Sequence, residues 1–384
     1  MKKSVFRRIL LVGGVAGMAL MAMFLPAVPP AAPEAKTETT NTVNTNAASH
    51  TLAAKEAGAA WAELEDASRP PTPPDEWQLK EPSHEEQARF LMPYVLILAD
   101  KARDFYSRFP ADTNALAARQ REFGILSWAV DNGGANQQAR LDAAEKAILA
   151  DPKLAEEDRF GIRNHAVERS VHARESEGDA AMLAEFEKGA RMLQKEFPKR
   201  PEVTAMLLQV AENSDPEKSR AVLKEIAASD AAAELKDAAA EMGKELERVG
   251  NPFPLKFTAV DGREVDLAKM QGKVVLVDFW ATWCEQCVEM LPAVKETYGK
   301  LHAKGFEIVG INLDQEEQSL TNLVAAQKLD WPEYFDGLYW QTKFAVQFDV
   351  KDLPAMWLVD KKGILRYINA GFDLNKKIDR LLAE

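Results

Sequence analysis

The feature that most restricts the fold of this chain is an apolar run, residues 273–280, followed closely by a Cys-x-x-Cys pair. The run has the composition of a buried β-strand, and Cys284 and Cys287 are the only two cysteines in 384 residues. A helix that starts at Cys284 offers it unpaired backbone N–H groups. The pattern therefore predicts a strand, a short turn and a helix within an α/β sheet, with both sulfurs at the first turn of the helix.

Two thiols at this spacing form a dithiol/disulfide redox pair. The N–H groups and the dipole of the helix favour the thiolate of Cys284, which is the nucleophilic form of cysteine. Cys287 lies one turn later on the same helix, so its sulfur can attack a mixed disulfide on Cys284 and expel the substrate thiol. This two-electron exchange needs no bound cofactor, and we predict none.

Two other uses of the pair are disfavoured. A structural zinc takes about four ligands, whereas the chain has no second cysteine pair and its five histidines show no matching cluster. A purely structural disulfide between residues three apart closes a very short loop and stabilises the fold little. The sequence therefore favours redox chemistry and predicts no metal site.

The basic N-terminus indicates export. Four Lys and Arg residues precede an apolar stretch that runs from residue 9 to about residue 28. Residues 1–28 are therefore expected to be either a signal peptide or an N-terminal membrane anchor that tethers the protein, and everything that follows lies outside the cytoplasm. The net charge of −12 argues against a nucleic acid partner.

The next two parts of the chain differ in pattern. Residues 29–82 are rich in Pro, Ala and Thr and lack a regular apolar pattern apart from a candidate short helix near residues 52–64, so we predict a disordered linker. Residues 83–249 carry apolar side chains at three- and four-residue spacing, with breaks such as Pro110 and Pro152. This pattern predicts an all-α domain of helical hairpins that weakly resembles tetratricopeptide repeats, either as a docking surface or as a spacer.

Residues 250–384 alternate strands and helices. We expect strands at 274–279, 307–312, 355–359 and 364–369, a hairpin at 257–267, and helices at 284–302, 316–328 and from about 374. That order predicts an α/β sheet with helices on both faces. Within it, the aromatic segment 331–340 either packs in the core, which is the commoner fate of aromatic rings, or lines a substrate groove.

Residues 277–287, Val-Asp-Phe-Trp-Ala-Thr-Trp-Cys-Glu-Gln-Cys, resemble the active-site segment of the thioredoxin superfamily. Pro292 and the segments 306–312 and 353–360 narrow the resemblance to the TlpA/ResA-like thiol-disulfide oxidoreductases of the bacterial cell envelope. The resemblance covers about residues 251–384. It implies a thioredoxin-like fold for this part and a periplasmic or other extracytoplasmic location.

The resemblance also implies roles for single residues. Pro354 would be the cis-proline opposite the cysteines, and with Trp283 and Leu353 it would line the substrate groove. Asp278 matches a buried acid that accepts the proton of the resolving cysteine. ResA-like proteins carry a glutamate three residues after the second cysteine, where this chain has Met290.

We therefore predict an exported thiol-disulfide oxidoreductase that reduces protein disulfides. Cys284 would be the nucleophile, Cys287 the resolving thiol and Asp278 the proton acceptor. The expected partners are proteins that contain disulfides, and a thiol carrier in the membrane would supply the electrons.

Two alternatives stay open. In one, the helical domain binds partners and the dithiol is little used. In the other, Thr282, two residues before Cys284, belongs to a peroxiredoxin-like peroxidase. A peroxidase needs an arginine near the thiolate, and Arg366 is the only arginine between Arg263 and Arg380.

Overall fold

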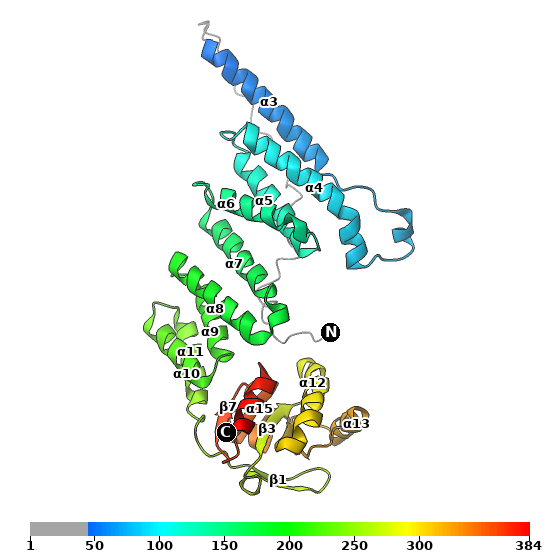
Figure 1. Cartoon of the computed structure of the whole chain (residues 1–384), viewed down its shortest axis with the longest axis vertical. Coiled ribbons are helices and arrows are strands. Elements are labelled where there is room, and N and C mark those ends of the chain that lie inside the picture. The colour runs from blue at the N-terminus through cyan, green and yellow to red at the C-terminus, as the bar shows by residue number, and fades with distance from the viewer. Residues whose placement is uncertain (1–44) are drawn as a thin grey trace. The chain divides into compact units, whose positions relative to one another are not determined.

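The computed structural model describes residues 45–384, with side chains from residue 54 onward (Figure 1). The predicted signal or anchor segment, 1–28, lies outside the described residues. Among the helices of the described part, none has both the length and the hydropathy that a membrane crossing requires. The chain separates into two compact units, with the division between Arg163 and Asn164.

The first unit is helical. Its elements are α3 (Thr45–Ala67), η2 (Asp75–Gln78), α4 (His84–Arg108), α5 (Ala115–Asp131), η3 (Ala135–Gln137), α6 (Gln138–Leu149) and the first part of α7 (Glu156–His172). Helix α4 starts with a capping box, in which the side chains of Ser83 and Glu86 each accept a hydrogen bond from the backbone N–H of the other residue. The core of this unit gathers around Leu64, Phe105 and Leu126.

Helix α3 contains the candidate short helix near residues 52–64 and corrects the prediction of a disordered linker for the rest of Thr45–Ala67. The end of α3 is ordered by contacts with residues distant in the sequence. Leu64 is only 1% exposed, and Arg121 of α5 donates a hydrogen bond to Glu65 at 2.9 Å. Because most helix stability in proteins comes from tertiary packing, a linker-like composition did not prevent this helix from forming.

The second unit also starts with helices. They are the end of α7, η4 (Glu175–Glu177), α8 (Asp179–Glu196), α9 (Pro201–Glu212), α10 (Pro216–Ala228) and α11 (Ala233–Leu246). From α8 to α11, each helix packs on its neighbour in the sequence. Pro201 and Pro216 occupy the first turns of α9 and α10, where the missing N–H of proline leaves no hydrogen bond unmade. The helix-rich region predicted before residue 250 is confirmed.

An α/β domain completes the second unit. Its strands are β1 (Lys256–Thr258), β2 (Glu264–Asp266), β3 (Val274–Trp280), β4 (Phe306–Asn312), β5 (Glu333–Tyr334), β6 (Ala355–Val359) and β7 (Leu365–Tyr367). β1 and β2 form a separate antiparallel hairpin, and the main sheet has the order β5-β4-β3-β6-β7. Strands β3, β4 and β5 run parallel to one another, whereas β6 and β7 pair antiparallel with their neighbours.

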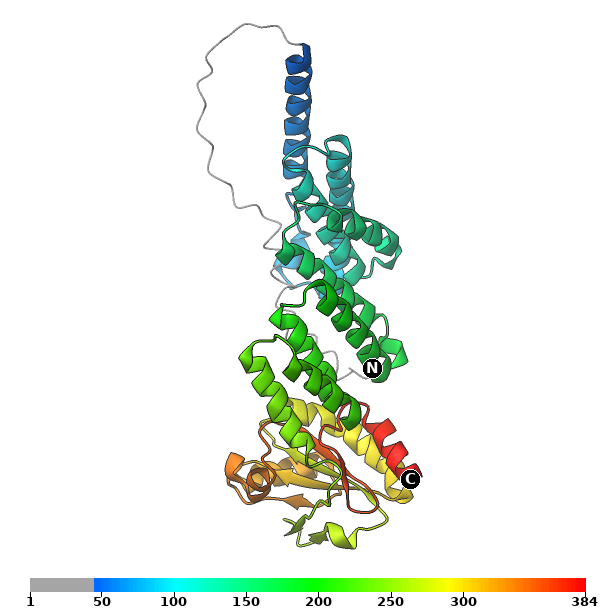
Figure 2. The same ribbon diagram turned by 90° about the vertical axis from the view of Figure 1, so that its left-hand side faces the viewer.

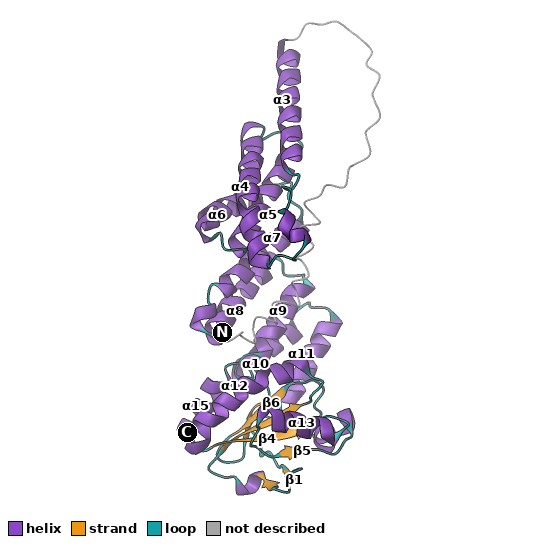
Figure 3. Ribbon diagram, turned by 90° about the vertical axis from the view of Figure 1, so that its right-hand side faces the viewer, coloured by secondary structure: helices purple, strands orange, loops and turns teal. Residues whose placement is uncertain are grey.

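Helices cover the sheet on both faces, as the alternation of the sequence predicts. They are η5 (Leu267–Lys269), α12 (Glu285–Leu301), η6 (His302–Lys304), α13 (Glu317–Gln327), η7 (Tyr339–Gln341), α14 (Lys343–Gln347) and α15 (Leu374–Ala383). Helices α12 and α15 lie side by side on one face (Figures 2 and 3). On the other face, Phe344 and Phe348 at α14 contact the rings of Phe257 and Phe279.

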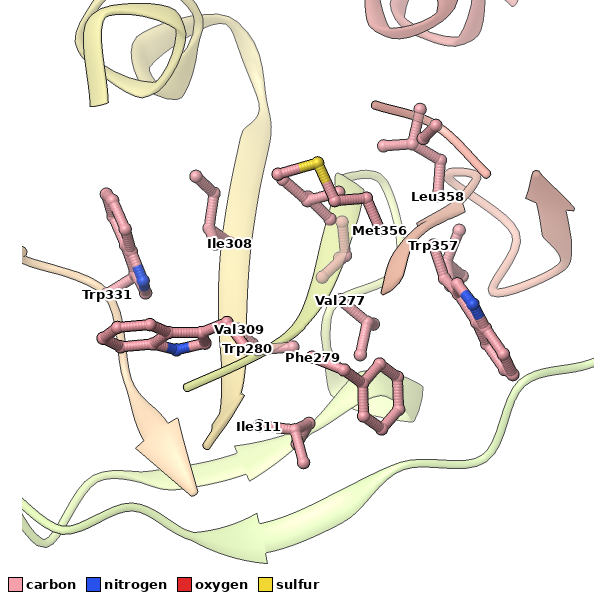
Figure 4. Close-up of a cluster of buried hydrophobic side chains, with 14 of the residues drawn as sticks. Val277, Phe279, Trp280, Ile308, Val309, Ile311, Trp331, Met356, Trp357 and Leu358 are labelled. Carbon is pink, nitrogen blue, oxygen red and sulfur yellow. The ribbon is translucent and has the colours of Figure 1, made fainter. Parts of the chain in front are cut away.

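The core sits on both faces of the central strands. Strands β3 and β4 are buried along their whole length. Figure 4 shows Phe279 and Ile311 on the side of the sheet that faces the β1–β2 hairpin, and Ile308 and Met356 on the opposite side. This burial holds the carboxyl end of β3 rigidly at the point where the chain turns toward the cysteines.

The domain boundary predicted at residue 249 remains a proposal. Ion pairs connect the segments on its two sides: Arg380 and Asp215 lie 3.4 Å apart, Arg248 and Asp349 lie 3.8 Å apart, and Lys351 binds Glu241. All three pairs are substantially exposed, so each contributes little to stability. Helices α8–α11 therefore contact the α/β domain, but the ion pairs between them contribute little to the stability of this contact.

Candidate active site

The two cysteines form a disulfide at the start of α12. The chain leaves β3 at Trp280, turns, and enters the helix with Cys284 as the N-cap residue. The Sγ atom of Cys284 accepts a hydrogen bond from the backbone N–H of Cys287 at 3.2 Å. A sulfur at this place receives both an N–H donor and the positive end of the helix dipole, and both stabilise a thiolate after reduction.

The two cysteines differ in their surroundings. Cys284 is 9% exposed and Cys287 is 3% exposed, whereas Trp283, directly before Cys284, is 46% exposed. Cys287 shares the buried face of α12 with Leu291 and Val294. The chain therefore presents Cys284 at the outer edge of the site and Cys287 behind it.

An acid that the sequence reasoning missed, Asp314, holds the loop before the cysteines. Its carboxylate accepts hydrogen bonds from the backbone N–H of Thr282 at 3.1 Å and from the Thr282 hydroxyl at 2.9 Å. Asn312 also donates to it, at 2.9 Å. The sequence signal for Asp314 was its position two residues after Asn312, the last residue of β4. The carboxyl ends of parallel strands lie at one edge of the sheet, so an acid after β4 is expected near the end of β3.

The peptide bond between Leu353 and Pro354 is cis, as the resemblance implied. Strand β6 begins at the next residue, Ala355, which pairs with Phe279 near the end of β3. This register places Pro354 beside the end of β3 and hence beside the turn that leads to Cys284. Leu353 and Pro354 are both half-buried, so part of each side chain reaches the surface.

Aromatic side chains surround the exposed indole of Trp283. Its ring centroid lies 5.0 Å from that of Tyr339 and 6.0 Å from that of Trp340. Leu338 is 56% exposed and Tyr339 is 36% exposed. We call Trp283, Leu338, Tyr339 and Trp340 the aromatic surface. Core packing, the first predicted alternative for residues 331–340, is confirmed for Trp331, which is buried, and Trp340 also packs partly against the core. That the exposed part of the segment lines a substrate groove stays a prediction.

Asp278 lies inside the domain, on β3. It is 3% exposed, and burial raises its pKa from 3.8 to about 7. Its partner across the β3–β6 ladder is Met356. Met356 and Met290 of α12 both lie next to Gly371, since a Cβ atom on Gly371 would be 3.3 Å from Met290 and 3.4 Å from Met356. The side chain of Met356 is therefore on the face of the sheet that α12 covers. Because opposed residues of a ladder share one face, Asp278 projects toward α12, the helix that carries both cysteines.

A second buried acid, Glu333 of β5, was also missed. It is 1% exposed, and one carboxylate oxygen accepts a hydrogen bond from the indole N–H of Trp280 at 2.9 Å. Burial, with a smaller contribution from the charge of Asp278, raises its pKa to about 8. The signal in the sequence was a single acid enclosed by aromatic residues and proline, Trp-Pro-Glu-Tyr-Phe.

No group of three or more His, Cys, Asp or Glu side chains within residues 54–384, the part whose side chains the structure describes, is arranged to hold a metal ion. The chemistry that these residues support by themselves is thiol–disulfide exchange with a nearby proton acceptor. A cysteine pair at the start of a helix, after a central strand and beside a cis-proline, is typical of thioredoxin-like oxidoreductases.

Comparison with known proteins identifies the family within this class. The Redoxin family matches residues 248–382. The thiol-disulfide oxidoreductase ResA from one strain of Bacillus cereus is 33% identical over 121 residues, which are 31% of this chain and 68% of that protein. ResA of Bacillus subtilis is 28% identical over 123 residues, 32% of this chain and 66% of that protein.

Among solved structures, the chain is similar to the thioredoxin domain of a thiol-disulfide oxidoreductase from Bacteroides vulgatus. The sequence identity is 25% and the TM-score is 0.33, over 35% of this chain and 97% of that one. The chain belongs to the ResA-like thiol-disulfide oxidoreductases of the thioredoxin superfamily. It is an oxidoreductase with a thioredoxin-like C-terminal domain, and its substrates contain disulfides.

Proposed function

We propose that this protein is exported and reduces disulfides in other proteins through a dithiol formed by Cys284 and Cys287. The observation that carries the proposal is the Cys284–Cys287 disulfide at the start of α12, with Cys284 the less buried cysteine, next to Trp283 of the aromatic surface. The cis peptide bond at Pro354 lies beside the end of β3, from which the chain turns toward Cys284. Export is supported by the basic and apolar pattern of residues 1–28. By the same pattern, the segment either is removed or tethers the protein to the membrane.

The first step is attack on the client. In the reduced protein, the Cys284 thiolate attacks one sulfur of a client disulfide. A bond between Cys284 and that sulfur forms, the client S–S bond breaks, and the other client sulfur leaves as a thiolate that takes a proton from water. The N–H groups at the start of α12 stabilise the Cys284 thiolate before the attack.

The second step releases the client. The Cys287 thiol gives its proton to the carboxylate of Asp278, and the resulting thiolate attacks the Sγ atom of Cys284. The bond between Cys284 and the client sulfur breaks, the client leaves reduced, and the disulfide seen in the structure forms. An external dithiol must then reduce the protein again, and we propose a membrane thiol carrier as this donor.

Client binding is proposed at the surface around the outer sulfur. Trp283, Leu353 and Pro354 form the groove, and the aromatic surface extends it. Exposed apolar side chains next to a reactive group favour contact with apolar client residues near the disulfide. A proline at the edge of the site removes one N–H from the main chain, so a client strand can approach there.

Replacing Trp283 with alanine tests this surface. We expect about a tenfold lower kcat/KM for a protein disulfide, since loss of an exposed aromatic contact costs about 1–2 kcal/mol of binding. Turnover of a small disulfide reagent should change less than about twofold. Met192→Ala, which removes another exposed apolar side chain, is the control. Equal losses for the protein and the small reagent would show that Trp283 supports the disulfide itself and does not contact clients.

The helical region before residue 250 is proposed as either a client-docking domain or a spacer. A fragment of residues 248–384 should fold and reduce a small disulfide reagent within about twofold of the longer protein, because it contains the whole sheet and its own core. If the helices dock clients, the fragment should capture native clients less well. A fragment that is unfolded by circular dichroism would place the helices within the catalytic domain and contradict the boundary.

The peroxidase alternative gains no support from the geometry. Arg366, the arginine that a peroxidase would use, is bound by Asp360 at 3.1 Å and by Glu384 at 2.5 Å. An adaptor with a little-used dithiol would show no turnover, so an insulin disulfide reduction assay separates it from the proposed enzyme.

A further inference from the structure

The two buried acids of the site lie in one row across the sheet. Asp278 of β3 is opposite Gly310 of β4, and Gly310 is opposite Glu333 of β5. Opposed residues in a parallel sheet point to the same face. Asp278 and Glu333 therefore flank Gly310 on the face that carries α12.

Gly310 makes room for the carboxyl group of Glu333. A Cβ atom at Gly310 would lie 1.9 Å from Oε2 of Glu333 and 2.4 Å from its Cδ. These distances are far shorter than any non-bonded distance between two heavy atoms. The carboxyl group therefore lies over Gly310, in the space between β5 and β3, and extends toward Asp278.

Both acids are nearly without solvent, and each has one oxygen without a hydrogen-bond partner. Asp278 is 3% and Glu333 is 1% exposed. Oδ1 of Asp278 and Oε1 of Glu333 are the unpartnered atoms, whereas Trp280 donates to the other oxygen of Glu333 and hydrogen bonding from Trp331 also lowers the pKa of Glu333. Buried polar atoms without a partner are costly, and two carboxylates that share a dry site cannot both ionise easily.

The groups that face this pair are few. Cys287 comes from α12, and the opposed residues of β4 and β6, Gly310 and Met356, do not titrate. Arg263, from the β1–β2 turn, lowers the pKa of Glu333 slightly, but its guanidinium is bound by Asp261 and by a backbone carbonyl. Burial outweighs it and raises the pKa of both acids toward neutrality.

We propose that Asp278 and Glu333 share one proton behind the redox disulfide, and that Glu333 is a positioning residue that sets the pH range in which Asp278 accepts the proton of Cys287. The inference rests on the proposed function and adds a residue to it. A proton held between Oδ1 of Asp278 and Oε1 of Glu333 gives each oxygen the partner that it lacks. Trp280 fixes the orientation of the Glu333 carboxyl group.

The pair changes only its protonation during the reaction. With Glu333 protonated, the Asp278 carboxylate takes the Cys287 proton as the bond between Cys287 and Cys284 forms and the bond to the client breaks. At higher pH Glu333 also ionises, and a second negative charge then opposes formation of the Cys287 thiolate. The resolving step should therefore be fastest between the two ionisations and slower on either side.

The test is the pH dependence of client release in a single turnover of the reduced protein with a disulfide peptide, measured from about pH 5 to about pH 10. The wild-type rate should fall about tenfold between its maximum and about one pH unit above the second ionisation. Glu333→Gln should keep the rise of the rate at acidic pH (the acidic limb) and lose its fall at alkaline pH (the alkaline limb). Gly310→Ala, which retains both acids but displaces the Glu333 carboxyl group, should lose the alkaline limb as well.

A purely structural role gives a different result. If Glu333→Gln lowers the rate by the same factor at every pH, Glu333 only supports Trp280 and the inference is overturned. Infrared titration of the unaltered protein tests the shared proton without any variant. The bands of two protonated carboxyl groups should disappear between about pH 6 and about pH 9. No such band would also overturn the inference. If the protein reduces no disulfide at any pH, the proposed function is contradicted instead. The infrared titration then still tests whether Asp278 and Glu333 share a proton.

Discussion

Replacing Cys287 with serine should convert the protein into a trap that holds its clients by a disulfide to Cys284. The first attack needs only the outer sulfur, whereas release needs the second thiol one turn later on α12. Turnover of a protein disulfide should fall by on the order of 10³-fold, as expected when a residue that acts covalently is removed. Non-reducing electrophoresis of extracts from cells that express the variant measures the trapped complexes.

Cys284→Ser is the matched control, because it keeps one thiol in the same helix. It should lose turnover to the same extent and trap almost no client, since Cys287 is only 3% exposed. Abundant mixed disulfides on Cys287 in this variant would reverse the assignment of the two sulfurs.

Asp278→Asn should slow the release step without slowing the first attack. General-base catalysis typically contributes about 10²-fold or more, so the mixed disulfide with a model peptide should accumulate and decay about 10²-fold more slowly near neutral pH. Rapid acid quenching followed by mass spectrometry resolves the two steps. Unchanged decay would show that Asp278 does not accept the Cys287 proton.

The same substitution should stabilise the folded protein above neutral pH. The pKa of Asp278 is raised to about 7 from 3.8, so between about pH 4 and about pH 7 the folded state keeps a proton that the unfolded chain has lost. Wild-type stability therefore falls over this range as pH rises, and Asp278→Asn removes the fall. At about pH 8 the variant should be more stable by on the order of 3 kcal/mol.

Urea denaturation at about pH 4 and about pH 8 measures this difference, which should be small at the lower pH. Asp379→Asn, at an exposed acid of α15, is the control and should change the free energy of unfolding little at either pH. A variant that is equally stable or less stable at the higher pH would mean that the carboxyl group of Asp278 is not held in a dry environment.

Much of the redox domain could be predicted from the sequence because its signals are local. The apolar run of β3 and the two cysteines lie within fifteen residues of one another, so their relation depends only on a strand, a turn and a helix. The cis-proline and the role of Asp278 came from the resemblance, and the structure confirms the cis bond at Pro354 and the burial of Asp278.

The residues that were missed depend on contacts between strands. Asp314 and Glu333 follow Cys284 by tens of residues, and they reach the site only because β4 and β5 add to β3 in a definite register. The contribution of Gly310 is likewise invisible in the sequence, since the space that it leaves is filled from a neighbouring strand. The same reason explains helix α3, whose order depends on packing against α4 and α5.

The most direct test of the account is a single turnover of the fully reduced protein with excess insulin, in the absence of any other reductant. We expect one insulin disulfide to be reduced for each protein molecule, with the Cys284–Cys287 disulfide as the other product, identified by mass spectrometry. The Cys284→Ser variant should reduce none. Insulin left intact by the wild-type protein, or reduced equally by Cys284→Ser, would contradict the assignment of this dithiol as a reductant of protein disulfides.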